Sequence, residues 1–321
     1  MAVSKCGSNI TQLLAEVKDR YEPDVQVTRL RRLGIGYTVL GDSSYPELLG
    51  EAADAPVILY VKGSIESIGI PGIAVVGSRK YTYYGRDTAR YLSAECAKAG
   101  LSIISGLALG IDAEAHRATL AVGGSTVAVL GCGLDQVYPA GHAGLAREIV
   151  EKGGALVSEF SPGTPPIKPH FPMRNRIIAG LAIGTLVIEA GEKSGALITA
   201  YSALESNREV FAVPGNIDSE TSKGTNQLIK EGAKLVTSAE DIFEELEIKV
   251  TLNRDGGSSQ DLSQDEKIII DLLSKGVCPA DDMLANSGMN VISLNTVLTA
   301  LEMKGMVENM GGGRYRRTQG M

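Results

Sequence analysis

Short apolar runs alternate with amphipathic stretches along most of the chain, and the alternation is most regular between residues 73 and 112. Residues 73–76 form a continuous apolar run, which is typical of a parallel strand covered on both faces. A helical pattern follows, in which Ala89, Leu92 and Cys96 share one face, and a second apolar run occupies residues 101–104. We therefore predict a strand, a helix and a second strand in this order.

The same alternation continues to residue 246. The further predicted strands are residues 126–130, 155–158, 185–188, 209–213 and 234–237. One predicted helix follows the second strand. Further helices are predicted at residues 141–153, 174–181, 196–206, 224–232 and 239–246. Regular exchange of strand and helix is the pattern of the α/β class. The sequence predicts a Rossmann-like, doubly wound and mostly parallel sheet.

Composition divides the chain into four parts. Residues 1–44 form a short N-terminal helical segment, 45–247 the Rossmann-like domain, 248–263 a polar linker, and 264–321 a small C-terminal domain. The last part shows three amphipathic helices and then a hairpin, which is the order of a winged helix. The exposed positions of its third helix are polar but scarcely basic, so a protein-interaction role is at least as well supported as duplex binding.

The overall charge restricts the partners of the protein. The 321 residues carry a net charge of −7, so nucleic acid would need a local basic patch. The four cysteines and three histidines are not at metal-ligand spacing, and we expect reduced thiols in a cytoplasmic protein with no metal. No apolar run approaches the roughly 20 residues of a membrane span.

Small residues follow the first two predicted strands of the regular region. Gly77, Ser78 and Arg79 come after the first strand, and Ser105, Gly106 and Gly110 come after the second. Because the carboxyl ends of parallel strands meet at one edge of a sheet, these loops are expected to form one ligand pocket. Backbone N–H groups approach a ligand closely where no Cβ intervenes, and Arg79 adds positive charge, so a phosphate is the expected ligand.

Basic side chains gather on the same strand-end loops, and one aromatic residue accompanies them. These side chains are Arg79, Lys168, Arg174 and Arg176, with Phe171 between them in sequence. Cations beside an aromatic ring are what single-stranded nucleic acid requires. The two later arginines flank Asn175 at a predicted helix start, where the helix dipole disfavours cations unless an anion lies between them. The alternative is that these arginines are structural and pair with Glu159 or Glu189 in the core.

Enzyme motifs are incomplete in this sequence. The loop at residues 77–82 is not a G-x-G-x-x-G, and there is no phosphate-binding G-x-x-x-x-G-K-[ST] or nucleophile elbow. We therefore expect no dinucleotide cofactor. Asp112 is either a general base or a helix cap, whereas His116 and His142 are assigned to packing or hydrogen bonding.

A set of motifs in a fixed order makes a family resemblance specific. The motifs are Tyr45-Pro46, Gly77-Ser78-Arg79, Ser105-Gly106-x-Ala108-x-Gly110-Ile111-Asp112, Gly131-x-Gly133-Leu134-Asp135, Tyr138-Pro139, Phe171-Pro172-x-Arg174-Asn175-Arg176-Ile177-Ile178-Ala179-Gly180, Ser194-Gly195-Ala196, Val213-Pro214-Gly215 and Gly224-Thr225-Asn226. Over residues 45–245 the chain resembles the DprA/Smf family of bacterial DNA-processing proteins.

The resemblance implies a protein that is not an enzyme. Members of this family bind single-stranded DNA, form homodimers, and load the bacterial recombinase during natural transformation. The implied nucleic-acid-binding residues are Gly77, Ser78, Arg79, Ser105, Gly106, Gly110, Lys168, Phe171, Arg174, Asn175 and Arg176. Because only residues 1–44 precede the first motif, the helical N-terminal domain common in the family is expected to be shortened or absent. The alternative function is a nucleotide-binding enzyme of the phosphoribohydrolase type.

Overall fold

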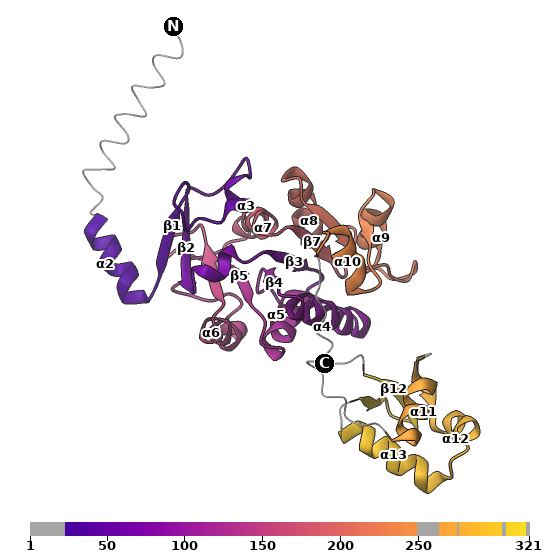
Figure 1. The fold of residues 1–321 in the computed structure, drawn as a ribbon. Helices are drawn as coiled ribbons and strands as arrows, with labels where there is room; N and C mark the ends of the chain where they lie inside the picture. The colour runs from indigo at the N-terminus through magenta and orange to yellow at the C-terminus, as the bar shows by residue number, and fades with distance from the viewer. Residues whose placement is uncertain (1–22, 249–262, 275, 304–305, 319–321) are drawn as a thin grey trace. The chain divides into compact units, whose positions relative to one another are not determined.

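A computed structural model describes residues 23–248, 263–274, 276–303 and 306–318 (Figure 1). The chain divides into two compact units, Met1–Lys249 and Val250–Met321. The division falls inside the segment predicted as a linker, and residues 249–262 of that segment lie outside the described part. Residues 10–17, which belong to the predicted N-terminal helical segment, also lie outside it.

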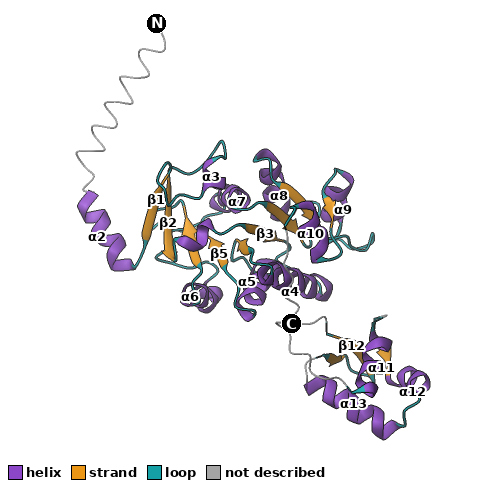
Figure 2. Ribbon diagram, viewed as in Figure 1, coloured by secondary structure: helices purple, strands orange, loops and turns teal. Residues whose placement is uncertain are grey.

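The first unit is built on a nine-stranded sheet in the order β1-β2-β6-β5-β4-β3-β7-β8-β9 (Figure 2). Its strands are β1 Gly36–Val39, β2 Ile58–Gly63, β3 Gly72–Val76, β4 Ser102–Ser105, β5 Thr126–Val129, β6 Ala155–Ser158, β7 Gly184–Val187, β8 Glu209–Ala212 and β9 Lys234–Leu235. All neighbours from β6 to β9 in this order are parallel, and β1 and β2 are added antiparallel at one edge. The predicted mostly parallel, Rossmann-like sheet is confirmed.

Helices cover both faces of this sheet (Figure 1). They are α2 Pro23–Leu33, α3 Glu47–Gly50, α4 Tyr83–Lys98, α5 Ile111–Ala121, α6 Ala143–Glu151, α7 His170–Gly180, α8 Gly195–Glu205, α9 Lys223–Lys230 and α10 Ala239–Glu245. Helices α3, α7, α8 and α9 pack on one face, whereas α4, α5, α6 and α10 pack on the other. None of the described helices combines the length and the apolar character that a bilayer crossing requires.

Strand β3 lies at the centre of the unit, as its apolar run predicts. All five of its residues are buried, with Ala74 and Val76 facing one helical layer and Ile73 and Val75 facing the other. Strands β4, β5 and β6 follow on one side of β3, while β7, β8 and β9 lie on its other side. The chain direction across the sheet therefore reverses between β3 and β7, and such a switch point leaves a crevice at the carboxyl ends of the strands.

One helix boundary was predicted wrongly. Helix α7 begins at His170 and not at residue 174, so Arg174 and Arg176 lie in its second turn. The Pro172 ring is accommodated because the first turn of a helix has no N–H groups bonded within the helix. The argument that these arginines face a helix N-terminus is therefore wrong, and any role for them has to come from their contacts.

In its described residues, the second unit contains three helices and a three-stranded sheet of order β10-β12-β11. The elements are α11 Gln264–Leu273, β10 Cys278–Pro279, α12 Ala280–Ser287, α13 Val291–Met303, β11 Val307–Asn309 and β12 Arg314–Arg317. The helices and the hairpin match the predicted order. The two-residue strand β10 was not predicted, because two residues are too few to show an alternating pattern.

Candidate nucleic-acid interface

A small pocket of about 50 Å³ opens where β3, β4 and β5 end. Its lining comes from three strand-end loops and from α7. The lining residues are Arg79, Gly106, Ala108, Leu109, Tyr138, Pro139, Phe171 and Arg174. We call this the arginine–aromatic pocket. It brings together four of the predicted site residues, namely Arg79, Gly106, Phe171 and Arg174.

Arg79 and two aromatic rings form the accessible side of this pocket. The guanidinium carbon of Arg79 lies 5.8 Å from the centre of the Phe171 ring, and the Phe171 and Tyr138 ring centres are 5.4 Å apart. Arg79 is exposed and makes no ion pair with any residue that the structure describes. A cation over the face of a ring is favourable by itself. The arrangement offers an anion a free guanidinium and offers a planar group a ring beside it.

Arg174 has a different environment, because its side chain is buried beneath the loop that follows β4. Arg174 is 4% exposed, and its Nη1 donates to the Gly106 carbonyl at 2.7 Å and to the Val129 carbonyl. Burial lowers the pKa of Arg174 to about 10, although the nearby Asp112 carboxylate opposes the shift. The guanidinium ties together the ends of β4 and β5, so its first role is structural.

Arg176 also has partners within the protein. Its guanidinium contacts Glu159 Oε2 at 2.6 Å and donates to the Asp54 carbonyl at 2.6 Å. Burial raises the pKa of Glu159, and the positive charge of Arg176 opposes that rise. The pairing with Glu159 is the one that the structural alternative predicted. Arg176 therefore carries a charge that is already compensated when no ligand is present.

The backbone N–H groups of the loop after β4 are engaged inside the protein. Asp112 is buried, and its Oδ2 accepts from the N–H groups of Gly106 and Ala108 at 3.1 and 3.3 Å. The Gly106 amide was expected to be available to a phosphate, but here it is bonded to Asp112. Asp112 does not cap its own helix, since it holds the preceding loop instead. Positive charge in the pocket must therefore come from side chains.

The glycines of these loops serve close packing. Gly110 has φ +94°, and a Cβ on it would overlap the Ser78 carbonyl oxygen. A Cβ on Gly106 would lie within 2.6 Å of the Arg174 guanidinium. Both positions need glycine because two loops, or a loop and a buried arginine, approach each other without space for a side chain. This close approach is what places Arg79 beside the loop after β4.

The remaining predicted residues lie outside the pocket lining. Ser78 Oγ donates to the Lys80 carbonyl at 2.8 Å, and Ser105 Oγ donates to the Val75 carbonyl at 2.6 Å. Asn175 Nδ2 donates to the Gly195 carbonyl at 3.2 Å. Gly77 precedes Arg79 at the end of β3, and Lys168 is an exposed residue of the loop before α7. The three side chains with hydrogen bonds support the loops, and Lys168 is exposed outside the pocket lining.

Four lining residues were not among the predicted site residues. Leu109 and Tyr138 are 54% and 47% exposed, which is high for large apolar side chains, and Ala108 and Pro139 complete the set. The signal was available, since apolar residues in loops at strand ends seldom belong to a core. His116 and His142 hydrogen-bond to Thr126 Oγ1 at 2.7 Å and to the Leu107 carbonyl at 2.8 Å, which confirms their structural assignment.

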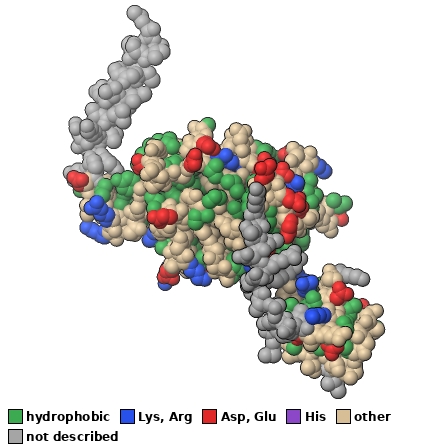
Figure 3. All heavy atoms as spheres, in the orientation of Figure 1, with side chains coloured by type: hydrophobic (Ala, Val, Ile, Leu, Met, Phe, Trp, Pro, Cys, Tyr) green, Lys and Arg blue, Asp and Glu red, His purple; other side chains and the backbone are tan. Residues whose placement is uncertain are grey.

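The surface charge agrees with the acidic composition. On the face in Figure 3, Asp and Glu side chains gather over α8, α9 and α10. A strand of nucleic acid would meet repulsion on such a surface, so its binding depends on local cations such as Arg79.

Each of the two units matches a family model of known proteins. Residues 36–247 match the family model for DNA recombination-mediator protein A, and residues 255–313 match the model for the DprA winged helix domain. The chain is 42% identical to Protein Smf of Escherichia coli over 279 residues, which cover 85% of this chain and 75% of that protein. It is 46% identical to DNA processing protein DprA of Streptococcus pneumoniae over 206 residues, covering 64% and 72% of the two chains.

Two solved structures resemble the first unit. The X-ray structure of DNA processing protein A from Streptococcus pneumoniae aligns with a TM-score of 0.62 and 43% identity, over 68% of this chain and 77% of that chain. The DNA processing protein A of Helicobacter pylori, described for its single-stranded DNA binding mode, aligns with a TM-score of 0.59 and 30% identity, over 65% and 95% of the chains. By these matches, the chain belongs to the DprA/Smf family of DNA-processing proteins.

Proposed function

We propose that this protein binds single-stranded DNA in the arginine–aromatic pocket and loads the bacterial recombinase onto the strand during natural transformation. The observation that carries the binding proposal is the exposed Arg79 guanidinium 5.8 Å from the Phe171 ring centre. A phosphate has a cation there and a neighbouring base has a ring to stack on, which is the combination that single strands require. A duplex keeps its bases paired and has none to offer to the ring.

Arg174 supports this role from beneath the surface. Its buried charge lies at the floor of the pocket, and a positive charge in a low-dielectric environment acts more strongly on a nearby phosphate than one in water. Asp112 compensates part of that charge. Arg79 is thus the direct phosphate contact in this proposal, and Arg174 positions the loops around it.

We infer a homodimer as the working form, acting in the cytoplasm where incoming strands meet the recombinase. Exposed apolar side chains on α8 and the edge strand β9 support a second copy as partner. These are Ile198, Tyr201, Leu204 and Leu235, which are 41%, 44%, 54% and 43% exposed. Pairing would cover these side chains and the free edge of β9.

The carboxylate that follows β7 is buried and hydrogen-bonded within the protein, which favours a binding protein over the enzyme alternative. Glu189 is 2% exposed and accepts from the N–H and hydroxyl of Thr82 at 2.9 and 2.5 Å. A general acid or base needs a carboxylate that can reach a substrate proton. Both carboxylate oxygens of Glu189 are instead bonded to Thr82 at the start of α4, so we assign the protein no hydrolytic reaction.

The loading step is tested by following recombinase assembly on a single strand with and without the protein. We expect assembly to be faster with the wild-type chain and not accelerated by the Arg79→Ala variant, because loading requires the strand to be held. Equal assembly rates with and without the wild-type protein would rule out the loading role. Strand binding is measured separately and would be unaffected by that outcome.

A further inference from the structure

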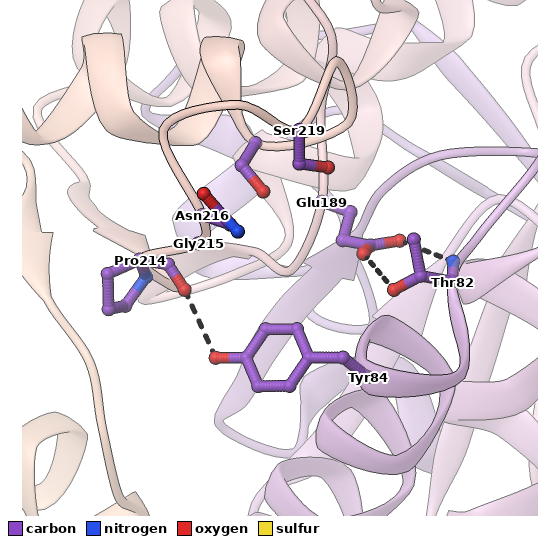
Figure 4. Close-up of a pocket in the computed structure, with 8 residues that line it drawn as sticks. Thr82, Tyr84, Glu189, Pro214, Gly215, Asn216 and Ser219 are labelled. Carbon is purple, nitrogen blue, oxygen red and sulfur yellow. Dashed lines mark hydrogen bonds between the residues drawn. The ribbon is translucent and has the colours of Figure 1, made fainter.

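A second and larger pocket, of about 400 Å³, lies beside Thr82 at the start of α4 (Figure 4). Its lining comes from the loops that follow β3, β7 and β8 and from the first turn of α4. The lining residues are Thr82, Tyr84, Glu189, Pro214, Gly215, Asn216, Ser219 and Ser222. We call this the switch-point pocket, and it shares no residue with the arginine–aromatic pocket. Its volume is in the range of small-molecule sites.

The position of this pocket is the one where α/β sheets bind ligands. Strands β3 and β7 are neighbours, and the chain proceeds in opposite directions across the sheet on either side of them. The helices that follow them, α4 and α8, therefore lie on opposite faces of the sheet, and this divergence leaves a crevice at the carboxyl ends of the strands, although Thr82 and Glu189 join the two loops by hydrogen bonds. The proposed strand site at the ends of β3, β4 and β5 does not use this crevice.

The walls of the switch-point pocket are fixed before any ligand arrives. Asn226 holds the Gly215 backbone from both sides, accepting from its N–H at 3.2 Å and donating to its carbonyl at 3.0 Å. Tyr84 Oη donates to the Pro214 carbonyl at 3.1 Å, which joins α4 to the loop after β8 (Figure 4). Gly85 also lacks space for a Cβ, because that atom would overlap the Glu189 carboxylate. A preformed wall reduces the entropy lost on binding.

The chemistry of the lining excludes a phosphate and favours a neutral polar ring. Of the described residues that line the pocket, Glu189 alone is charged, and its negative charge repels phosphate. The amide nitrogen of Asn216 and the hydroxyl of Ser222 make no hydrogen bond to any described residue, so both are available to a ligand. The Tyr84 and Pro214 rings add apolar surface. Mixed donors and acceptors beside apolar rings suit a nucleobase.

We propose that the switch-point pocket is a second ligand site that takes an uncharged nucleobase, as a free nucleoside or as a base of a bound strand. Both sources are within reach. Thr82 follows Arg79 by three residues, a distance of at most about 10 Å along the chain. A strand held at Arg79 is therefore long enough to reach this crevice with a neighbouring base. Only this strand source rests on the proposed function.

The test compares a pocket-filling variant with a matched control in the full chain. Ser219→Phe places a ring in the pocket from the loop after β8. Ser206→Phe makes the same change at a half-buried serine at the C-terminus of α8. This serine precedes the start of β8, whereas the pocket lies beyond the carboxyl ends of the strands. The first probes are adenosine, guanosine, cytidine and thymidine, titrated by calorimetry. The second probe is a single strand with one 2-aminopurine, whose fluorescence reports whether that base is shielded.

We expect a nucleoside to bind the wild type and Ser206→Phe alike, and to bind Ser219→Phe roughly tenfold or more weakly. If no free nucleoside binds, 2-aminopurine shielding that is lost only in Ser219→Phe supports the strand source. Ser219→Phe behaving like wild type with both probes would overturn the proposal. Asn216→Trp is the second filling variant if Ser219→Phe does not fold. A wild type that binds no strand at all would contradict the proposed function, whereas the nucleoside titration would still decide this pocket.

Discussion

The Arg174→Ala variant is expected to unfold with a free energy about 2–6 kcal/mol lower than the wild type, because each of two buried carbonyls that lose their donor costs about 1–3 kcal/mol. Arg174 is buried, and its removal leaves the carbonyls of Gly106 and Val129 without their donor. It also leaves the buried Asp112 carboxylate without its neighbouring positive charge. Lysine is not an adequate replacement, because one ammonium does not reproduce the geometry of the guanidinium.

Urea unfolding of the full chain, read in the transition of the first unit, measures this loss. Arg79→Ala is the matched control, since it removes the same kind of side chain from an exposed position of the same pocket. We expect the control to change stability by no more than about 0.5 kcal/mol. An Arg174→Ala variant that is as stable as the wild type, yet binds strands poorly, would show that Arg174 is held for the ligand and not for the fold.

The Arg79→Ala variant is expected to bind single strands about 1–3 kcal/mol more weakly than the wild type, the range for a lost charged hydrogen bond. Its affinity should also depend less on salt, by a slope of about 0.7 for the one phosphate no longer neutralised. Fluorescence anisotropy over a series of salt concentrations measures both quantities.

The control for this measurement is Lys98→Ala, which removes an exposed cation from the last turn of α4. Lys98 lies before the amino end of β4, whereas Arg79 follows the carboxyl end of β3. We expect its strand affinity and its salt slope to match those of the wild type. Unchanged affinity of Arg79→Ala at low salt would show that Arg79 does not contact the strand. A similar loss in both variants would show that the strand responds to the overall charge of the protein.

The fold was predictable because its signals are local. The buried run of β3 and the small residues after it are contiguous in sequence, and the central strands β4, β5, β6 and β7 are also fully buried, whereas the edge strands β1 and β9 are not. The motif Phe171-Pro172-x-Arg174-Asn175-Arg176 identified the family for the same reason. The start of α7 was missed because Pro172 was treated as lying before the helix, although its first turn accommodates proline.

The roles of the arginines were not predictable from local signals. Arg174 is bonded to Gly106 and Val129, which are 68 and 45 residues away, and Arg176 reaches Asp54 at a separation of 122 residues. The local sequence around a basic residue does not show whether its side chain binds a ligand or a carbonyl that is distant in sequence. Tyr138 was part of a motif, but its place beside Phe171 depends on the loop after β5 meeting α7. Such contacts exist only once the sheet has formed.

We propose that Arg79 and Phe171 hold the single strand. The most direct measurement is a competition between a labelled single strand and unlabelled duplex of equal length, at fixed salt, with the full chain. We predict that the single strand binds far more tightly than the duplex and with little dependence on sequence, because the contacts are phosphates and stacked bases. Equal affinity for single strand and duplex would contradict the account.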